Sequence, residues 1–319
     1  MNLHRFIAVL VFGFCLLPSV SFSASFDCKK AATAFEKAVC ADPKVSKLDE
    51  DLAAGYNKAI AALSKDGQKI LRDGQRRWLS YANDFCLKYK NDQQNCLELV
   101  YERRIQDMDT AAKKIGPFVF SRIDYFYVKD DPDFGRPSQG ETSYPRIDNP
   151  TTEALKKWNS VMAPVTANGD YGDEETGCDN FDGFTIISAT DSMISAELTN
   201  WMFGHGAAHG YGGTNGKIYI LKPDLHPFKT EDLFSDSTNW RNFVNKRCIE
   251  AAGDLIKPED REQYKDLGTD PSTWSFTHEG LAINIGAGSV LGPMDEYKST
   301  TIRWSDLKPY LAPSAPIPQ

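Results

Sequence analysis

The chain has 319 residues and a formal net charge of −8 at pH 7, and this length suits two domains better than one. Residues 24–116 carry 17 Lys and Arg against 14 Asp and Glu, whereas residues 117–319 carry 18 against 30. This acidic second half disfavours nucleic acid and anionic membranes as partners and favours a basic protein, although such a charge also serves solubility.

The first 23 residues have the pattern of a secretory signal peptide. His4 and Arg5 precede an apolar run over residues 6–17, and small residues place the cleavage near Ser23. The run is about half as long as a bilayer crossing requires, and no later segment comes closer, so no stable membrane insertion is expected. Cys15 lies inside the apolar run rather than at a lipidation site. We therefore expect a periplasmic or secreted mature protein.

Six cysteines remain after the signal peptide: Cys28, Cys40, Cys86, Cys96, Cys178 and Cys248. An even number in an exported chain indicates three disulfides, although six cysteines allow 15 pairings. The close spacing of the first four favours Cys28 with Cys40 and Cys86 with Cys96, which leaves Cys178 with Cys248. None of them has C-x-x-C spacing, so zinc-ribbon and thioredoxin-like sites have no support.

Residues 24–116 have the pattern of an all-α module. Thr33 and Glu36 form a capping-box pattern before a short helix, and Pro43 prevents that helix from continuing. Apolar residues then recur at helical spacing over three stretches, residues 48–63, 70–85 and 97–112. The two short-range disulfides would staple this small module, and each contributes about 3 kcal/mol in the chain-entropy model.

Three segments of this module carry a family resemblance. They are FDCKKAATAFEKAVCADPKVSKLDEDLAAGYNKAI, QRRWLSYANDFC and CLELVYERRIQDM, in this order and with all four cysteines. Together they resemble the N-terminal domain of the LprI-type lysozyme-inhibitor family. Most matching positions are helix core, caps and disulfides, so the resemblance implies a scaffold more strongly than a particular binding face.

From residue 117 the pattern changes to strands and turns. Strand patterns occur in PFVFSRIDYFYV, FTIISATD, MISAELTNWMF, GKIYILKPDL, TWSFTHEG, LAINIG and STTIRW. Helices are predicted over residues 151–163 and over TNWRNFVNKRCIEAAGDLI. Consecutive strands with segregated helices predict an α+β domain over residues 117–319, in which helices cover one face of an antiparallel sheet that STTIRW closes.

The segments GAAHGYGGTNGKIYILKPDLHPFKTEDLF, FTHEGLAINIG and TTIRWSDLKPYL carry a second resemblance. They look like the RsiV-type extracytoplasmic domain of lysozyme-sensing anti-sigma factors, with Ala207 in place of a glycine that is usual there. The resemblance implies an outer sensing or binding function. It does not imply signalling, because the sequence has neither the membrane helix nor the cytoplasmic segment that signalling would need.

The segment GHGAAHGYGG places His205 and His209 four residues apart. A metal site would need a third ligand from Glu197, Asp224 or His226, and its many glycines disfavour the helix that would align the two rings. We favour a structural turn at His209 and Gly210 in which the side chain of His209 is buried and hydrogen-bonded, while His205 faces solvent. Neither a metal nor another cofactor is expected.

Two polar loops are the candidate binding surfaces. One contains Tyr171, Asp173, Glu174 and Glu175, and the other contains Asp295, Glu296 and Tyr297. Clustered carboxylates of this kind could also belong to a glycoside hydrolase, or to ordinary solvated loops. No nucleophile motif of a hydrolase is present, so we expect no catalytic residue.

Two neighbouring modules with lysozyme-related resemblances favour a lysozyme inhibitor or lysozyme-binding protein that acts through its acidic C-terminal domain. The alternative is a peptidoglycan-binding or other glycan-binding module, or an accessory of cell-wall processing. In that case the rings of Trp201, Tyr211 and Trp274 would stack on sugars. A cell-wall hydrolase is the disfavoured third hypothesis.

Overall fold

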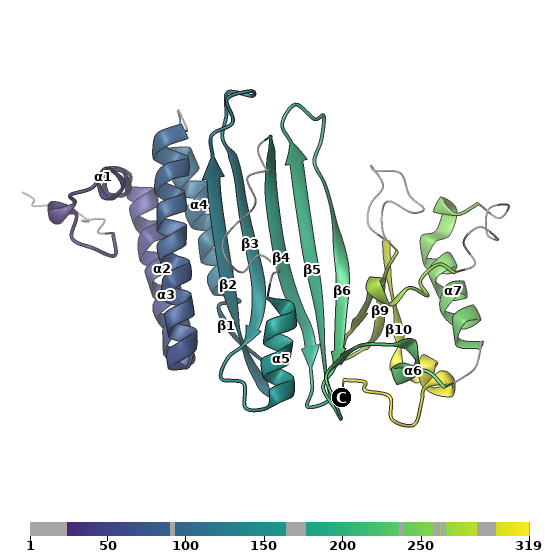
Figure 1. Ribbon diagram of the computed structural model, residues 1–319. Helices are drawn as coiled ribbons and strands as arrows, with labels where there is room; N and C mark the ends of the chain where they lie inside the picture. The colour runs from purple at the N-terminus through teal and green to yellow at the C-terminus, as the bar shows by residue number, and fades with distance from the viewer. Residues whose placement is uncertain are drawn as a thin grey trace, which may run out of the picture.

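Figure 1 shows the computed structural model as a row of three parts, with N-terminal helices, a long twisted sheet and a smaller C-terminal sheet with its own helices. The structure describes residues 24–89, 93–163, 177–235, 239–257, 259, 262, 264, 266–285 and 298–318. None of the helices in these ranges is long and apolar enough to cross a bilayer.

The N-terminal part is helical, as predicted. It consists of η1 (Cys28–Lys30), α1 (Ala34–Ala41), α2 (Pro43–Ala62), α3 (Lys65–Asn83), the π-helical turn η2 (Asp84–Tyr89) and α4 (Gln93–Met108). Thr33 and Glu36 form the predicted capping box of α1, and Asp42 accepts hydrogen bonds from the first amides of α2. These side chains satisfy amide groups that a helix start otherwise leaves without a partner.

Two of the predicted disulfides are confirmed, Cys28–Cys40 and Cys86–Cys96. The first joins η1 to the end of α1, and the second joins η2 to α4. Between them lies a core in which Trp78 meets Tyr101 edge-on at 5.0 Å between ring centroids. The disulfides therefore close the two ends of a module with a single apolar core.

The large sheet has seven strands in the order β1-β2-β3-β4-β5-β6-β7. They are β1 (Ala112–Ile115), β2 (Phe118–Lys129), β3 (Ser138–Ile147), β4 (Cys178–Ala189), β5 (Met193–Gly204), β6 (Tyr211–Ile220) and β7 (His226–Pro227). All neighbours are antiparallel except β3 and β4. A parallel pair needs a crossover, and α5 (Glu153–Met162) lies in that connection. Trp158 of α5 is buried against Phe120 of β2.

The last predicted helix of the N-terminal module is shorter than expected. It ends at Met108, and Ala112 instead begins β1 and pairs with Ser121 of β2. The side chains of Phe126 and Val128 on β2 pack against the helical core. The helices and the large sheet thus share a hydrophobic boundary.

A second sheet has three strands in the order β10-β9-β8, with β8 (Trp274–Phe276), β9 (Gly280–Ile285) and β10 (Lys298–Arg303). Three helices contribute side chains to its core: α6 (Thr230–Leu233), α7 (Asn239–Ala252) and α8 (Trp304–Leu307). The same part of the chain contains the short turns η3 (Gly253–Leu255), η5 (Pro271–Thr273) and η6 (Lys308–Tyr310). The expectation that STTIRW closes the single sheet is therefore wrong. Phe276 of β8 joins the two sheets, because its N–H donates to Ser195 Oγ at 2.9 Å and its carbonyl accepts from Ser188 Oγ.

The predicted Cys178–Cys248 disulfide is also wrong. Cys248 lies fully buried in α7, within the core of the second sheet, and its Sγ packs beside Gly268. Cys178 begins β4 in the large sheet, where its Sγ accepts a hydrogen bond of 3.3 Å from Asn180 Nδ2. The two thiols belong to different sheets, so neither is oxidised by the other.

Candidate functional site

A cavity of about 500 Å³ lies between the N-terminal helices and the large sheet. Aromatic side chains from both parts line it, namely Trp78, Tyr81, Phe85, Phe126 and Phe181. Polar lining comes from Arg103 of α4 and from Gln139 and Glu141 of β3. A concave apolar wall with a few polar groups is typical of a ligand-binding cavity.

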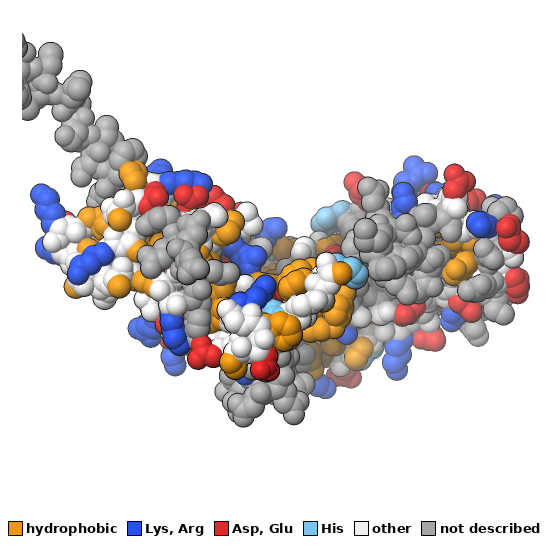
Figure 2. All heavy atoms as spheres, turned by 90° about the horizontal axis from the view of Figure 1, so that it is seen from above, with side chains coloured by type: hydrophobic (Ala, Val, Ile, Leu, Met, Phe, Trp, Pro, Cys, Tyr) orange, Lys and Arg blue, Asp and Glu red, His pale blue; other side chains and the backbone are white. Residues whose placement is uncertain are grey.

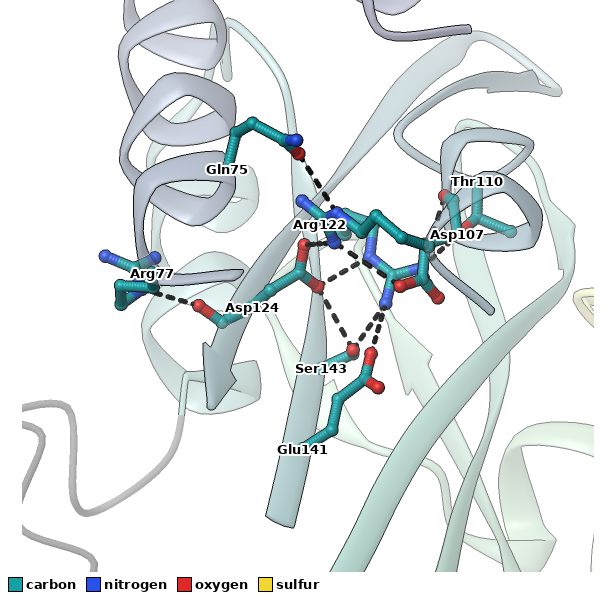
Figure 3. A network of polar contacts seen from close by, with 9 residues as sticks. Gln75, Arg77, Asp107, Thr110, Arg122, Asp124, Glu141 and Ser143 are labelled. Carbon is teal, nitrogen blue, oxygen red and sulfur yellow. Dashed lines mark hydrogen bonds and ion pairs between the residues drawn. The ribbon is translucent and has the colours of Figure 1, made fainter. Parts of the chain in front are cut away.

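A buried network of charges forms one end of this cavity (Figure 3). Arg104 and Asp107 lie three residues apart and therefore share one face of α4, while Arg122 and Asp124 lie two apart and share one face of β2. Arg104 Nη1 donates to Asp124 Oδ2 at 2.7 Å, and both side chains are at most 1% exposed. Arg122 Nε donates to the other oxygen of Asp124 at 2.5 Å, and Arg122 Nη1 lies 2.8 Å from Asp107 Oδ1.

The network holds its carboxyl groups in different protonation states. Burial opposes ionisation of Asp124, but Arg122 and Arg104 outweigh it and hold the pKa of this carboxyl well below its usual range. Burial, together with repulsion from Asp107 and Asp124, raises the pKa of Glu141 to about 8. Burial also raises the pKa of Asp107, so the proton that the network keeps at neutral pH lies with the interacting pair of Asp107 and Glu141.

A second cavity, of about 260 Å³, lies on the other side of this network and shares the lining residues Gln106, Asp107 and Glu141 with the first. Glu141 thus lies between the two cavities. Ser143 donates to Asp124 Oδ1 at 3.1 Å and accepts from Arg122 Nη2 at 2.6 Å. Each arginine has several carboxylate partners. Chemically the network can store a proton and hold α4 against the sheet.

A row of aromatic rings continues from the cavity across the sheet. Phe181 of β4 lies opposite Trp201 of β5, with 5.7 Å between ring centroids, and Trp201 stacks on Phe203 at 6.1 Å with 9° between the planes. The guanidinium of Arg103 lies 4.5 Å from the Phe181 ring centroid, and that of Arg136 lies 5.7 Å from Phe203. We call Phe181, Trp201 and Phe203 the aromatic row. Trp201 remains 43% exposed.

Two glycines of GHGAAHGYGG, Gly210 and Gly212, lie where β5 approaches the start of β6 closely. A Cβ on Gly210 would stand 2.5 Å from Cζ2 of Trp201, and a Cβ on Gly212 would stand 2.3 Å from the carbonyl oxygen of Asn200. Glycine at both positions lets the ring of Trp201 lie across the start of β6. The segment forms the β5–β6 turn between two paired strands, as predicted.

The two histidines have the opposite roles to those predicted. His205 is buried, with its Nδ1 2.6 Å from Asp131 Oδ2 and its Nε2 3.2 Å from Asp179 Oδ1. His209 is exposed, and its Nδ1 lies 3.1 Å from the carbonyl oxygen of Gly210. The glycines around His209 leave its side chain on the outside of the turn. The β2–β3 loop instead brings Asp131 over His205, which the sequence spacing did not reveal.

The remaining predicted residues are dispersed. Trp274 is fully buried, whereas Trp201 and Tyr211 are exposed, the latter by 59%. Glu197 accepts from Ser275, and His226 lies 3.3 Å from Asp232. Within the described ranges no three His, Cys, Asp or Glu side chains are grouped as metal ligands. The candidate contacts Tyr171, Asp173, Glu174, Glu175, Asp295, Glu296 and Tyr297 lie outside the described residues.

Sequence reasoning missed the buried network and most of the aromatic row. A signal for the network was present in SRID, where Arg122 and Asp124 alternate inside an otherwise apolar strand. Charged residues in such a strand are unusual unless they are paired. Nothing in the helical pattern of CLELVYERRIQDM marks Arg104 and Asp107 as buried.

Comparisons with known proteins give a partial family match and several distant structural likenesses, among them two DUF3298 family proteins. No curated protein matches the sequence. A crystal structure of a DUF3298 family protein from Pseudomonas aeruginosa aligns over 64% of this chain and 98% of its own, with 14% identity and a TM-score of 0.45. Another DUF3298 family member, from Bacteroides fragilis, aligns over 63% and 96%, with 11% identity and a TM-score of 0.47.

The family match falls on the N-terminal helices. Residues 28–108 match the family model described as lysozyme inhibitor LprI. The matched segment begins at the first cysteine of the first disulfide, ends with α4 and contains both disulfides. This quarter of the chain is therefore similar to the lysozyme inhibitor LprI.

Proposed function

We propose that this chain is an exported lysozyme-binding protein that acts as a lysozyme inhibitor. The observation that carries the proposal is the match of residues 28–108 to the LprI family model, with the predicted helices and both disulfides in place. Export is supported by the secretory pattern of residues 1–23 and by the disulfides, which are typical of oxidising compartments. The RsiV-type resemblance of residues 117–319 points to the same partner.

The charge of the second half supports a basic partner. Residues 117–319 carry 30 acidic against 18 basic side chains, and complementary charge accelerates association and fixes orientation. We place the contacts in the acidic loops around residues 171–175 and 295–297. Binding that depends on charge attraction should weaken as salt rises, because surface charges are screened within about 10 Å at 0.1 M ionic strength.

The proposal is for binding and not for catalysis. Asp107 and Glu141, the paired carboxyl groups of the buried network, lie among arginines that already bind Asp107. The mature protein alone is therefore expected to leave purified cell walls intact. Release of sugar from cell walls by the protein itself would contradict this part of the proposal.

The test is titration of residues 24–319 with a basic animal lysozyme by calorimetry, at low and at moderate salt. We expect saturable binding that weakens with salt. The triple reversal Asp173→Lys, Glu174→Lys and Glu175→Lys should weaken binding at least tenfold. The matched control reverses Glu50 and Asp51, two half-exposed carboxylates on α2, and should change little. Absence of binding at low salt would overturn the proposal.

A further inference from the structure

The aromatic row lies on an open part of the large sheet. Seen from above, the N-terminal helices and the C-terminal sheet form two lobes with a hollow between them, and hydrophobic side chains gather at its floor (Figure 2). The N-terminal helices pack on β2, and β8 packs near Ser195 of β5. The Phe203 end of β5 lies away from both contacts. This part of the sheet is therefore left uncovered by either lobe.

The surface around the row is flat and polar at its margins. Trp201 lies opposite Gly212, and Thr199 lies opposite Gly183 on β4 and Thr214 on β6. Directly opposed residues and residues two apart in a strand point to one face of a sheet. The exposed ring of Trp201 thus has two hydroxyl side chains beside it and no bulky neighbour on β6. Such a ring can pack on the C–H face of a sugar while the hydroxyls bind its polar groups.

Two arginines mark the ends of the row. Arg103 is exposed on α4, and its guanidinium lies over the Phe181 ring. Arg136 is paired with Asp179 and is still 43% exposed. Arginine binds planar carboxylates through two parallel hydrogen bonds. These cations fit an anionic ligand, and they disfavour a basic protein at the same place.

We propose that the aromatic row, with Arg103 and Arg136 at its ends, binds a carboxylate-bearing glycan strand. A sugar stacks on Trp201, its neighbours extend toward Phe181 and Phe203, and the acidic substituents face the two arginines. The cavity beside Phe181, with Gln139 and Arg103 in its lining, receives the substituent nearest α4. None of the residues assigned to this site is among those assigned above to lysozyme binding.

The chain offers a matched control on the same hairpin. Tyr211 lies opposite Met202, whereas Trp201 lies opposite Gly212. Successive residues of a strand point to opposite faces, so the two exposed aromatic side chains project from opposite sides of the sheet. Replacing Tyr211 therefore removes an exposed aromatic ring from the same hairpin and leaves the aromatic row intact.

The experiment titrates residues 24–319 with two probes, uncrosslinked peptidoglycan strands, which carry carboxylates, and chitohexaose, which carries none. Tryptophan fluorescence and calorimetry report binding. We expect the peptidoglycan strands to bind more tightly than chitohexaose. Trp201→Ala should weaken the binding of both probes about tenfold or more. Arg103→Gln should weaken only the binding of the peptidoglycan strands. Tyr211→Ala should bind like the parent protein. Circular dichroism and thermal unfolding check that each variant is folded.

The proposal is overturned if the parent protein binds neither probe or if Trp201→Ala binds them as tightly as the parent does. It is also overturned if Tyr211→Ala weakens binding as much as Trp201→Ala does. Loss of lysozyme binding in Trp201→Ala, without any glycan binding in the parent, would assign the row to a protein partner and also overturn it. Because the lysozyme titration is run on the same preparation, failure of the glycan site leaves the proposed lysozyme function standing, and the reverse also holds.

Discussion

Arg104 of α4 and Asp124 of β2 form a completely buried ion pair, 2.7 Å long, between the LprI-like helices and the large sheet. Arg104 Nε also donates to Gln75 Oε1 of α3 at 3.1 Å, and Arg77 Nε donates to the carbonyl of Asp124 at 2.7 Å. Two helices are therefore joined to one residue of β2. The helices are held on the sheet by charge as well as by apolar contact.

Replacing Asp124 with Asn should destabilise the protein strongly. Arg104 and Arg122 would lose their shared carboxylate while remaining buried, a change that typically costs about 3–5 kcal/mol. Urea unfolding measures the loss. The control is Asp51→Asn, which removes a surface partner of Lys47 and should cost less than about 1 kcal/mol. Equal losses in the two variants would show that the buried pair has no special role.

Replacing Glu141 with Gln should remove a pH dependence of stability. The pKa of Glu141 is raised from 4.5 to about 8 by burial and by Asp107 and Asp124. Between these values the folded state retains a proton that the unfolded state releases, so rising pH lowers the stability of the parent protein. The stability of Glu141→Gln relative to the parent protein should therefore rise steadily across this window and then level off above about pH 8. Urea unfolding of both proteins across this pH range measures the effect. A constant difference between their unfolding midpoints would contradict the prediction.

The two histidines of the β5–β6 turn should differ in their effect on stability. His205→Ala leaves Asp131 and Asp179 buried without the ring between them, and should cost about 2–3 kcal/mol. His209→Ala removes an exposed ring and should change stability by less than about 0.5 kcal/mol. Thermal unfolding compares the two variants directly. A larger loss from His209→Ala would restore the role that the sequence first indicated for it.

Native alkylation should find the cysteines in three different states. Cys28–Cys40 and Cys86–Cys96 should be recovered as disulfide-linked peptides. Burial raises the pKa of Cys248 to about 12, so its thiol should not react with iodoacetamide near pH 8 until the protein unfolds. Cys178 is half-buried and should react first. A peptide that links Cys178 to Cys248 would contradict the structure.

The sequence predicted those parts of the fold that depend on local signals. Thr33 with Glu36 marks the start of α1, and Pro43 marks the break after it. Two close cysteine pairs predict the two disulfides. Strand patterns predicted β5 almost to its ends and placed the turn after it. They overlapped β4 and β6 but missed the starts of both strands at Cys178 and Tyr211. Spacing along the chain is sufficient to predict a contact when the two residues lie near each other in the sequence.

The predictions that were wrong or missing concern contacts between residues that are distant in the sequence. His205 meets Asp131 across 74 residues, and Arg122 meets Asp107 and Glu141 from three different elements. The division of the C-terminal strands into two sheets is likewise set by packing around Phe276, not by strand pattern. Cys178 and Cys248 were paired by elimination alone, and elimination carries no geometric information.

The central claim is tested most directly by the rate at which a basic lysozyme clears a suspension of bacterial cell walls. With increasing amounts of residues 24–319 the rate should fall to a low plateau once the protein exceeds the enzyme. The Asp173→Lys, Glu174→Lys, Glu175→Lys variant should need at least ten times more protein to reach it. An unchanged rate at saturating protein would contradict inhibition, and an unchanged rate together with calorimetric binding would leave only a lysozyme-binding role.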